Sequence, residues 1–571
     1  MKNNDPTPAE TRPCPSAPPK PHSLVRRILF WTLLAGSVAG SIWWINWFPF
    51  HVDRLYSVIP PDATVIVEHR DLGARWPELA RNPLVRNLVA FTASAHGQSL
   101  DGSLDDPETA YWIQRLAGRH AVLAYIPFFD GSSDGDWVMA SWVGSFAHQM
   151  RWSMFWNRAD GNNTLDLGRG ERGWSMANEN DGTGKTLSLA LVDGALLACW
   201  SKDPQGVRVL AERKKWGAEP AQALRDKLAR LQTGTEPHAH LDPAPDRGWL
   251  RSLTPQSRRH PAHPVRFAVT VLDAHSVAGW IGFESDRAPG PSADEPPPID
   301  TGNPAFLKPL ETILGVSPAA LTVLPLGHAN RLLLQQNTHP AWQMLGALLT
   351  DAAGEQAPCF VSVCRPEYDG RVLGFRTPGI VMGLHLDKPE TGRRIVVSIL
   401  DILNAGLGLG LIPKDEIGTG GQNLIVVESV NTDAFLRLTP SERPTFAVAG
   451  NWLLFAANRS IMEKLSETGS TRGSESTPVA WRAAVEGRQT TAFAWMDFDA
   501  THTAAARSKA VYGLMAHVAR FPADQAIRQT LDGLALFADA ARPMKSGALW
   551  RDDAKSGTGF EFLIGENPAR P

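Results

Sequence analysis

Several features that identify common classes of enzyme and nucleic-acid-binding protein are absent from this chain. Four Cys in 571 residues are too few for a disulfide scaffold of this length. The 56 Lys+Arg are balanced by 59 Asp+Glu, a formal net charge of -3, so no basic excess is available to hold a nucleic acid. No H-E-x-x-H pair, P-loop or C-x-x-C motif occurs, and the G-x-S-x-G string from Gly131 to Gly135 lies in a predicted hairpin turn instead of a strand-to-helix elbow. We therefore predict no cofactor and no nucleic-acid partner, and the catalytic residues of any activity stay unknown.

The overall composition is that of a globular protein. The hydrophobic fraction is 43% and the charged fraction is 20%, which is too apolar for a disordered chain. At about 100–200 residues per domain, this length allows roughly three domains or two large ones.

One long uncharged stretch lies near the N-terminus. No Asp, Glu, Lys or Arg occurs between Arg27 and Asp53, and tryptophans gather toward the ends of this stretch. A hydrocarbon core about 30 Å thick needs about 20 apolar residues in a helix, and indole rings favour the headgroup region. We predict a transmembrane helix over residues 27–50, in contact with membrane lipid.

Charge on the two sides of this stretch predicts its orientation. Residues 1–27 carry five basic and two acidic side chains, whereas the following flank carries only Asp53 and Arg54. The more basic side stays cytoplasmic, so the region after residue 50 is expected to be exported, into the periplasm in a Gram-negative cell. Seven prolines before residue 22 indicate that 1–26 is a disordered cytoplasmic tail. The alternative is a signal peptide cleaved after Ser37-Val38-Ala39, but the apolar run continues beyond that point.

The region after the membrane segment contains internal similarity. Three pairs of segments occur in the same order at offsets of about 257, 256 and 254: 64–88 with 321–345, 192–210 with 448–465, and 238–242 with 492–497. Residues 285–304 are rich in Pro and read as a linker. We therefore predict two related modules, at 58–284 and 305–565.

Both modules are predicted to be α+β with mainly antiparallel sheets, because strands and helices alternate irregularly and tight turns join neighbouring strands. The predicted strands are near 64–69, 120–128, 136–144, 186–192, 195–201, 265–272, 277–284, 321–325, 358–364, 379–386, 423–428, 445–450, 452–457, 490–497, 532–538, 546–551 and 558–564. The predicted helices are near 74–95, 105–117, 205–213, 220–231, 338–350, 390–406, 459–467 and 503–520. Gly406, Gly408 and Gly410 are expected to end a helix and turn into a strand.

The start of the first module resembles a family of bacterial envelope proteins of unknown function. The resemblance lies in the segment Ile59-Pro60-Pro61-Asp62-Ala63-Thr64-Val65-Ile66-Val67, in the helix with Trp76 and the Asn82-Pro83 step, and in a strand-turn-strand element like 448–457. The second module departs from it, since no Pro-Pro-Asp-Ala precedes Leu321-Thr322-Val323. The resemblance implies a membrane anchor followed by tandem α+β repeats, and it brings no catalytic residues.

Two weak metal patterns have simpler explanations. Asp130, Ser132, Asp134 and Gly135 match the first half of a calcium loop, but Ser141 stands where the bidentate Glu should be, and a hairpin turn explains the same residues. His238 and His240 alternate on a strand as a metal pair would, although Ala492 and Ala494 replace them in the second module. We predict no metal site and keep Asp130, Asp134, His238 and His240 as the candidates.

Cysteine and tryptophan positions indicate packing. Cys359 and Cys364 are five apart on a predicted strand and so face opposite sides, which prevents a disulfide between them. Trp137 and Trp142 are also on opposite faces of a strand, which favours core positions over one aromatic platform.

The favoured function is a non-enzymatic binding or scaffolding component of the cell envelope, with a protein or an envelope polymer as partner. The alternative is an exported hydrolase or carbohydrate-active enzyme whose site lies at the interface of the two modules. A cleft with convergent carboxylates between the modules favours the enzyme, and an open strand edge favours the binder.

Overall fold

The computed structural model describes most of the chain. The described residues are 22–46, 50–60, 63, 65–87, 104, 106–127, 135–156, 163–168, 171–177, 185–203, 205–213, 221–222, 224–225, 238–241, 265–273, 275–283, 299–316, 318–330, 340–372, 375–430, 439–471, 479–518, 525–551 and 558–565.

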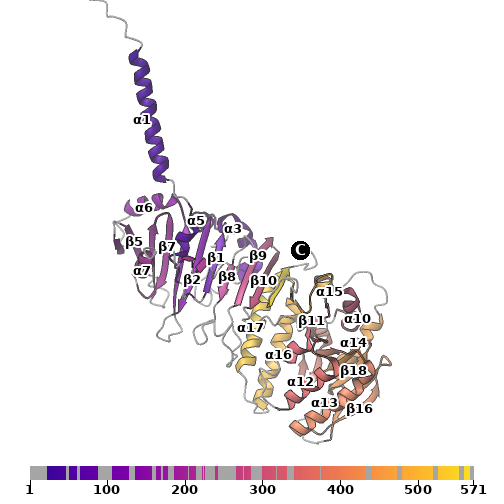
Figure 1. Ribbon diagram of the computed structural model, residues 1–571. Coiled ribbons are helices and arrows are strands. Elements are labelled where there is room, and N and C mark those ends of the chain that lie inside the picture. Colours follow the sequence, from indigo (N-terminus) through magenta and orange to yellow (C-terminus); the bar gives the residue numbers. More distant parts are fainter. Residues whose placement is uncertain are drawn as a thin grey trace, which may run out of the picture.

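A long apolar helix, α1 (His22–Asn46), precedes the folded region (Figure 1). Its segment Val25–Trp43 is long and apolar enough to cross a membrane, and none of that segment is buried against the rest of the protein. A signal sequence satisfies the same criteria of length and composition. The helix begins five residues before the predicted start at residue 27, and its last described residue is Asn46.

The folded region combines helices with one large antiparallel sheet, which confirms the α+β prediction. Its strands are β1 (Val65–Arg70), β2 (His120–Pro127), β3 (Gly135–Trp142), β4 (Asn163–Gly168), β5 (Glu171–Ala177), β6 (Thr186–Val192), β7 (Ala195–Ser201), β8 (His238–Leu241), β9 (Val265–Asp273), β10 (Ser276–Phe283), β11 (Pro318–Pro325), β12 (Pro358–Cys364), β15 (Ile380–His385), β16 (Leu411–Ile417), β17 (Asn423–Ser429), β18 (Thr445–Ala449), β19 (Trp452–Ala456), β20 (Phe493–Asp497), β21 (Ser546–Arg551) and β22 (Thr558–Gly565). Two short strands, β13 (Gly370–Val372) and β14 (Phe375–Thr377), form a separate ribbon.

Strand pairing gives the spatial order of the sheet. The first ten strands follow β4-β5-β6-β7-β3-β2-β1-β8-β9-β10. The next ten continue as β22-β21-β20-β11-β12-β15-β19-β18-β17-β16. The two series meet where β10 pairs antiparallel with β22, so that the C-terminal strand lies beside the end of the first series (Figure 1). When the strands of each series are numbered from one to ten along the sequence and followed outward from this junction, both series give the same spatial order. That order is 10-9-8-1-2-3-7-6-5-4.

Helices cover both faces of the sheet. In the first half they are α2 (Val52–Tyr56), α3 (Leu72–Arg81), α5 (Pro107–Leu116), α6 (Phe146–Trp156) and α7 (Gly206–Arg213). In the second half they are α10 (Pro304–Leu314), α12 (Pro340–Ala353), α13 (Gly392–Leu407), α14 (Arg459–Thr471), α15 (Ala480–Val485), α16 (Phe498–Val518) and α17 (Gln525–Ala541). Short 3-10 turns include η2 (Pro366–Tyr368) and η6 (Arg542–Met544).

Each half has its own core. In the first half, Leu55 and Tyr56 of α2 and Val207 and Leu210 of α7 pack against one sheet face, and α6 packs on the other. In the second half, α10, α14 and α15 cover one face and α12 and α13 cover the other. Burial of large apolar faces on both sides of a sheet supplies most of the stabilisation of such a fold.

A separate apolar cluster closes the junction between the halves. It joins Leu84, just after α3, with Val277 of β10 and with Ala538 and Ala541 of α17, together with Phe498 and Met544. The Nδ2 of Asn87 also donates a hydrogen bond to the carbonyl oxygen of Ala540 at 2.9 Å. The junction is therefore a strand ladder covered by packed side chains.

One predicted strand is wrong. Residues 532–538 belong to α17, because Ile527, Leu531, Leu534, Ala538 and Ala541 recur at helical spacing through the segment. The elements α2, α6, α10, α15, β4 and β5 were not predicted from the sequence. Most of them are short or have mixed apolar patterns, such as the NTLDLG of β4.

Two smaller predictions concern turns and the linker. Helix α13 ends at Leu407, Gly408 follows with φ of 66°, and β16 begins at Leu411, as the glycine spacing predicted. Of the predicted linker 285–304, only 299–304 are described, and Thr301 is buried there with its amide bonded to the Thr490 carbonyl at 2.7 Å. This end of the linker is built into the second half.

Candidate functional site

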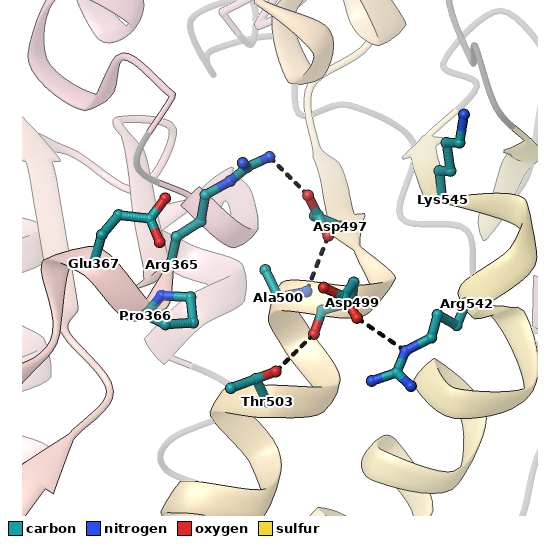
Figure 2. A pocket seen from close by; sticks show the side chains of 9 residues that line it. All are labelled: Arg365, Pro366, Glu367, Asp497, Asp499, Ala500, Thr503, Arg542 and Lys545. Carbon is teal, nitrogen blue, oxygen red and sulfur yellow. Dashed lines mark hydrogen bonds and ion pairs between the residues drawn. The ribbon is translucent and has the colours of Figure 1, made fainter.

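A cleft lined mostly by charged side chains lies at the start of α16 (Figure 2). It encloses about 360 Å³ and is lined by Arg365, Pro366, Glu367, Asp497, Asp499, Ala500, Thr503, Arg542 and Lys545. These residues come from three segments distant in sequence, which are the turn after β12 with η2, the junction of β20 with α16, and η6 with the residue after it.

One side of the cleft is built around Asp497, the last residue of β20. Its Oδ1 accepts a hydrogen bond from the Ala500 amide at 3.0 Å and so caps the first turn of α16. Its Oδ2 lies 2.7 Å from Nη2 of Arg365. The carboxylate thus holds the helix start and the end of β12 together.

The opposite side is built around Arg542 of η6. Its Nε lies 2.9 Å from Oδ1 of Asp499, and its Nη2 lies 3.1 Å from Nδ1 of His502. Lys545 follows with φ of 63°, a left-handed conformation, and its carbonyl accepts the Phe498 amide at 2.9 Å. The Arg542 and Asp499 side chains are 44% and 72% exposed, so this ion pair can exchange with a ligand.

The lining of the cleft suits recognition better than covalent chemistry. The lining holds three basic and three acidic side chains, so its formal charge is zero, and two opposite-charge pairs form in it, Arg365 with Asp497 and Arg542 with Asp499. The Thr503 hydroxyl donates to the Asp499 carbonyl at 3.1 Å within α16, so it is not paired with a base that would activate it. Such a lining fits a partner that carries both signs of charge.

A second polar cluster is buried in the first half, around Glu68 of β1. The Oε1 of Glu68 accepts a hydrogen bond from the Tyr56 hydroxyl at 2.7 Å and lies 2.8 Å from Nε2 of His120. Nε and Nη2 of Arg70 also donate to it, each at 3.2 Å. The Glu68 side chain is only 1% exposed, and its Oε2 has no hydrogen-bond partner among the described residues.

This environment shifts the pKa values of the Glu68 carboxyl and the Tyr56 hydroxyl. Burial alone would raise the pKa of the Glu68 carboxyl, but the contacts from His120 and Tyr56 and the charge of Arg70 lower it from 4.5 to about 2. Burial, followed by the charge of Glu68, raises the pKa of the Tyr56 hydroxyl well above its ordinary value of 10.0. At neutral pH the cluster therefore holds a carboxylate and a neutral phenol.

The Glu68 cluster fixes the segment that follows α1. Tyr56 lies on α2, ten residues after Asn46, and the nearby Phe50 ring lies 5.5 Å from the Trp142 ring and 5.6 Å from the His120 ring. The nearly complete burial of Tyr56 and Glu68 argues for a structural clamp. A shifted pKa is by itself no sign of catalysis, because structural ion pairs produce the same shifts.

The four metal candidates stay without a described site. His238 and His240 lie on β8, opposite Glu68 and Ile66 of β1 in the strand register, but their side chains lie outside the described residues. Asp130 and Asp134 lie in the segment 128–134, which is also outside them. Among the residues that the structure does describe, no group of three His, Cys, Asp or Glu could hold a metal ion.

The structure confirms two predictions: Cys359 and Cys364 form no disulfide, and Trp137 and Trp142 lie on opposite faces of one strand. Cys199, Cys359 and Cys364 are free thiols. Burial raises the pKa of each to about 12, so they are inert at neutral pH. Trp142 is buried in the core of the first half, and Trp137 packs on the other face of β3 beside Tyr125.

No family model, curated protein or solved structure matches this chain. The resemblance to bacterial envelope proteins therefore stays a prediction, and the functional argument depends on the geometry described above.

Neither the cleft nor the Glu68 cluster was identified from the sequence. The cleft could not be found, because no spacing relates Arg365, Asp497 and Arg542. Glu68 did leave a signal: in the strand VIVEHR it shares the inward face with Ile66, and a carboxylate at a core-facing position needs partners.

Proposed function

We propose that this protein is a single-pass membrane protein whose exported region is a non-enzymatic binding or scaffolding component of the cell envelope. The observation that carries the proposal is the exposure of α1. Side chains such as Leu29, Phe30 and Trp31 are 61–64% exposed, and no part of Val25–Trp43 is buried by protein. Apolar surface on that scale needs another cover, and lipid supplies it.

The strand order supports an ancestral duplication. Both ten-strand series visit their strands in the same sequence order, and they meet at one antiparallel pair, β10 with β22. Two copies joined edge to edge in this way make one extended surface behind a single anchor. We infer that the modules 58–284 and 305–565 are related and act as one rigid platform.

The junction gives no support to the enzyme alternative. A hydrolase at the interface of the modules needs a cleft there, whereas Leu84, Val277 and Ala538 pack together over the described β10–β22 ladder. The cleft at the start of α16 lies within the second half, and its paired charges favour recognition of a polypeptide that carries both signs of charge.

The membrane part of the proposal is tested by extraction and labelling. We expect the full-length protein to stay in membranes after alkaline carbonate washing. A cysteine at the 72% exposed Ile417 should react with a membrane-impermeant maleimide from the exported side. Release of the protein by carbonate, or a mature chain that begins after Ala39, would contradict the anchor.

The binding part is tested by photo-crosslinking in cells. A photoreactive amino acid at Thr503 in the cleft should give a defined crosslinked polypeptide, and the same amino acid at Ile417 should not. The band should weaken in an Arg542→Ala background, because that change removes one cleft cation. Equal crosslinking at both positions, or a band indifferent to Arg542→Ala, would remove the cleft from the proposal.

A further inference from the structure

A cluster of exposed aromatic and basic side chains lies on α5 in the first half. Tyr111 is 46% and Trp112 is 42% exposed, and their rings lie 5.5 Å apart. The guanidinium carbon of Arg115 lies 5.3 Å from the ring centroids of both Tyr111 and Phe146. Large apolar rings beside an exposed guanidinium are unusual on a surface that faces only water.

The length of the chain after α1 places this cluster close to the end of the apolar helix. Phe50 is four residues after Asn46, so their Cα atoms are at most about 14 Å apart. Phe50 is not a loose linker residue, since it packs against Trp142 and His120 and carries the Arg119 guanidinium 4.7 Å from its ring centroid.

Contacts lead from Phe50 to the α5 cluster. Arg119 connects the end of α5 to β2, and Phe146, at the start of α6, follows Trp142 by four residues. The Phe146 ring lies 6.3 Å from the Trp112 ring. In Figure 1, α1 rises from the end of the first half at which α5 and α6 lie. The tether and the aromatic cluster thus share one end of the molecule.

We propose that this end docks on the phospholipid surface, with Tyr111 and Trp112 in the headgroup layer and Arg115 and Arg119 against lipid phosphates. Indole and phenol rings favour the headgroup region, and guanidinium groups form paired hydrogen bonds with phosphate. Glu108 is the acidic residue in contact with the cluster, and it accepts the Trp112 indole N–H at 3.3 Å. The proposal rests on the proposed function, because it needs α1 to remain in the bilayer.

Spin labels on the full-length chain in phospholipid nanodiscs test the docking. In a Cys14→Ser background, labels are placed by Trp112→Cys, and by Glu108→Cys, which leaves every aromatic and basic member in place. Ile417→Cys serves as the exposed control on the edge strand β16, and Leu34→Cys reports the insertion of α1. Collisions with lipid-dissolved oxygen and with a water-soluble nickel chelate are measured at each position.

We expect the labels at 108 and 112 to be several-fold less accessible to nickel than the label at 417, and more accessible to oxygen. Arg115→Glu with Arg119→Glu should restore nickel access at 108, most clearly with anionic lipids. If the label at 34 contacts lipid while the labels at 108 and 112 are as accessible to nickel as the label at 417, the docking proposal is wrong and the membrane anchor is supported. If position 34 is itself open to nickel, the anchor and the docking both fail.

Discussion

The Tyr56 hydroxyl donates a 2.7 Å hydrogen bond to Oε1 of Glu68, and both side chains are almost fully buried. Tyr56 belongs to the short helix α2 that follows the apolar α1, whereas Glu68 belongs to the strand β1 near the centre of the first half. This contact joins the segment after the apolar helix to the sheet.

Tyr56→Phe should destabilise the first half by about 1–2 kcal/mol, because a buried carboxylate loses one hydrogen bond but keeps Arg70 and His120. Glu68→Ala should cost more, about 3–5 kcal/mol, since it leaves two buried partners without an acceptor. Urea unfolding followed by tryptophan fluorescence measures both. Tyr111→Phe on the surface is the matched control, and an equal loss in that variant would contradict a special role for the Tyr56 contact.

Acid should weaken the same cluster. The folded-state pKa of Glu68, about 2, lies below the unfolded value of 4.5, so its stabilisation is complete above pH 4.5 and is lost as the pH falls toward 2. The loss should approach about 3 kcal/mol. Between pH 6 and pH 3, the unfolding free energy should decrease by more in the wild type than in Glu68→Gln. Parallel pH profiles for the two proteins would show that Glu68 is not the titrating group.

The junction cluster should contribute to the stability of the whole platform. Leu84→Ala removes a side chain that is 6% exposed and should cost about 2–4 kcal/mol. Calorimetry of the full-length chain measures the shift, and Leu536→Ala on α17, where the side chain is 42% exposed, serves as the control. Equal shifts in both variants would mean that Leu84 does not contribute to a packed junction.

The three described thiols should not react with thiol reagents until the protein unfolds. Burial raises the pKa of Cys199, Cys359 and Cys364 to about 12, so very little thiolate exists at pH 8. In a Cys14→Ser background, a disulfide reagent should titrate three thiols in urea and almost none in buffer. Rapid reaction of the folded protein at any of the three positions would contradict this packing.

Local patterns were sufficient for much of the secondary structure. Alternating apolar residues predicted β2, β3, β6 and β7, and the glycines after α13 predicted the turn into β16, because these elements depend on neighbours in the sequence. The error at 532–538 arose where a short apolar run allows both periods. The helical spacing is visible only over the longer segment from Ile527 to Ala541, and the helix packs against Val277 and Phe498.

Unlike these elements, the cleft could not be predicted from local sequence patterns. Arg365, Asp497 and Arg542 come from separate elements, and no local pattern relates them; the fold brings them together at the start of α16. The ladder between β10 and β22 is similar, since it joins residues almost 300 positions apart.

The apolar helix, the α+β character and the buried thiols follow from composition and short-range periodicity, which are properties of the chain before it folds. The continuity of the sheet across both halves, the clamp around Glu68 and the charged cleft depend on which distant segments pair. That choice is made by burial of whole faces and by satisfaction of buried polar groups, which are energies of the folded molecule as a whole.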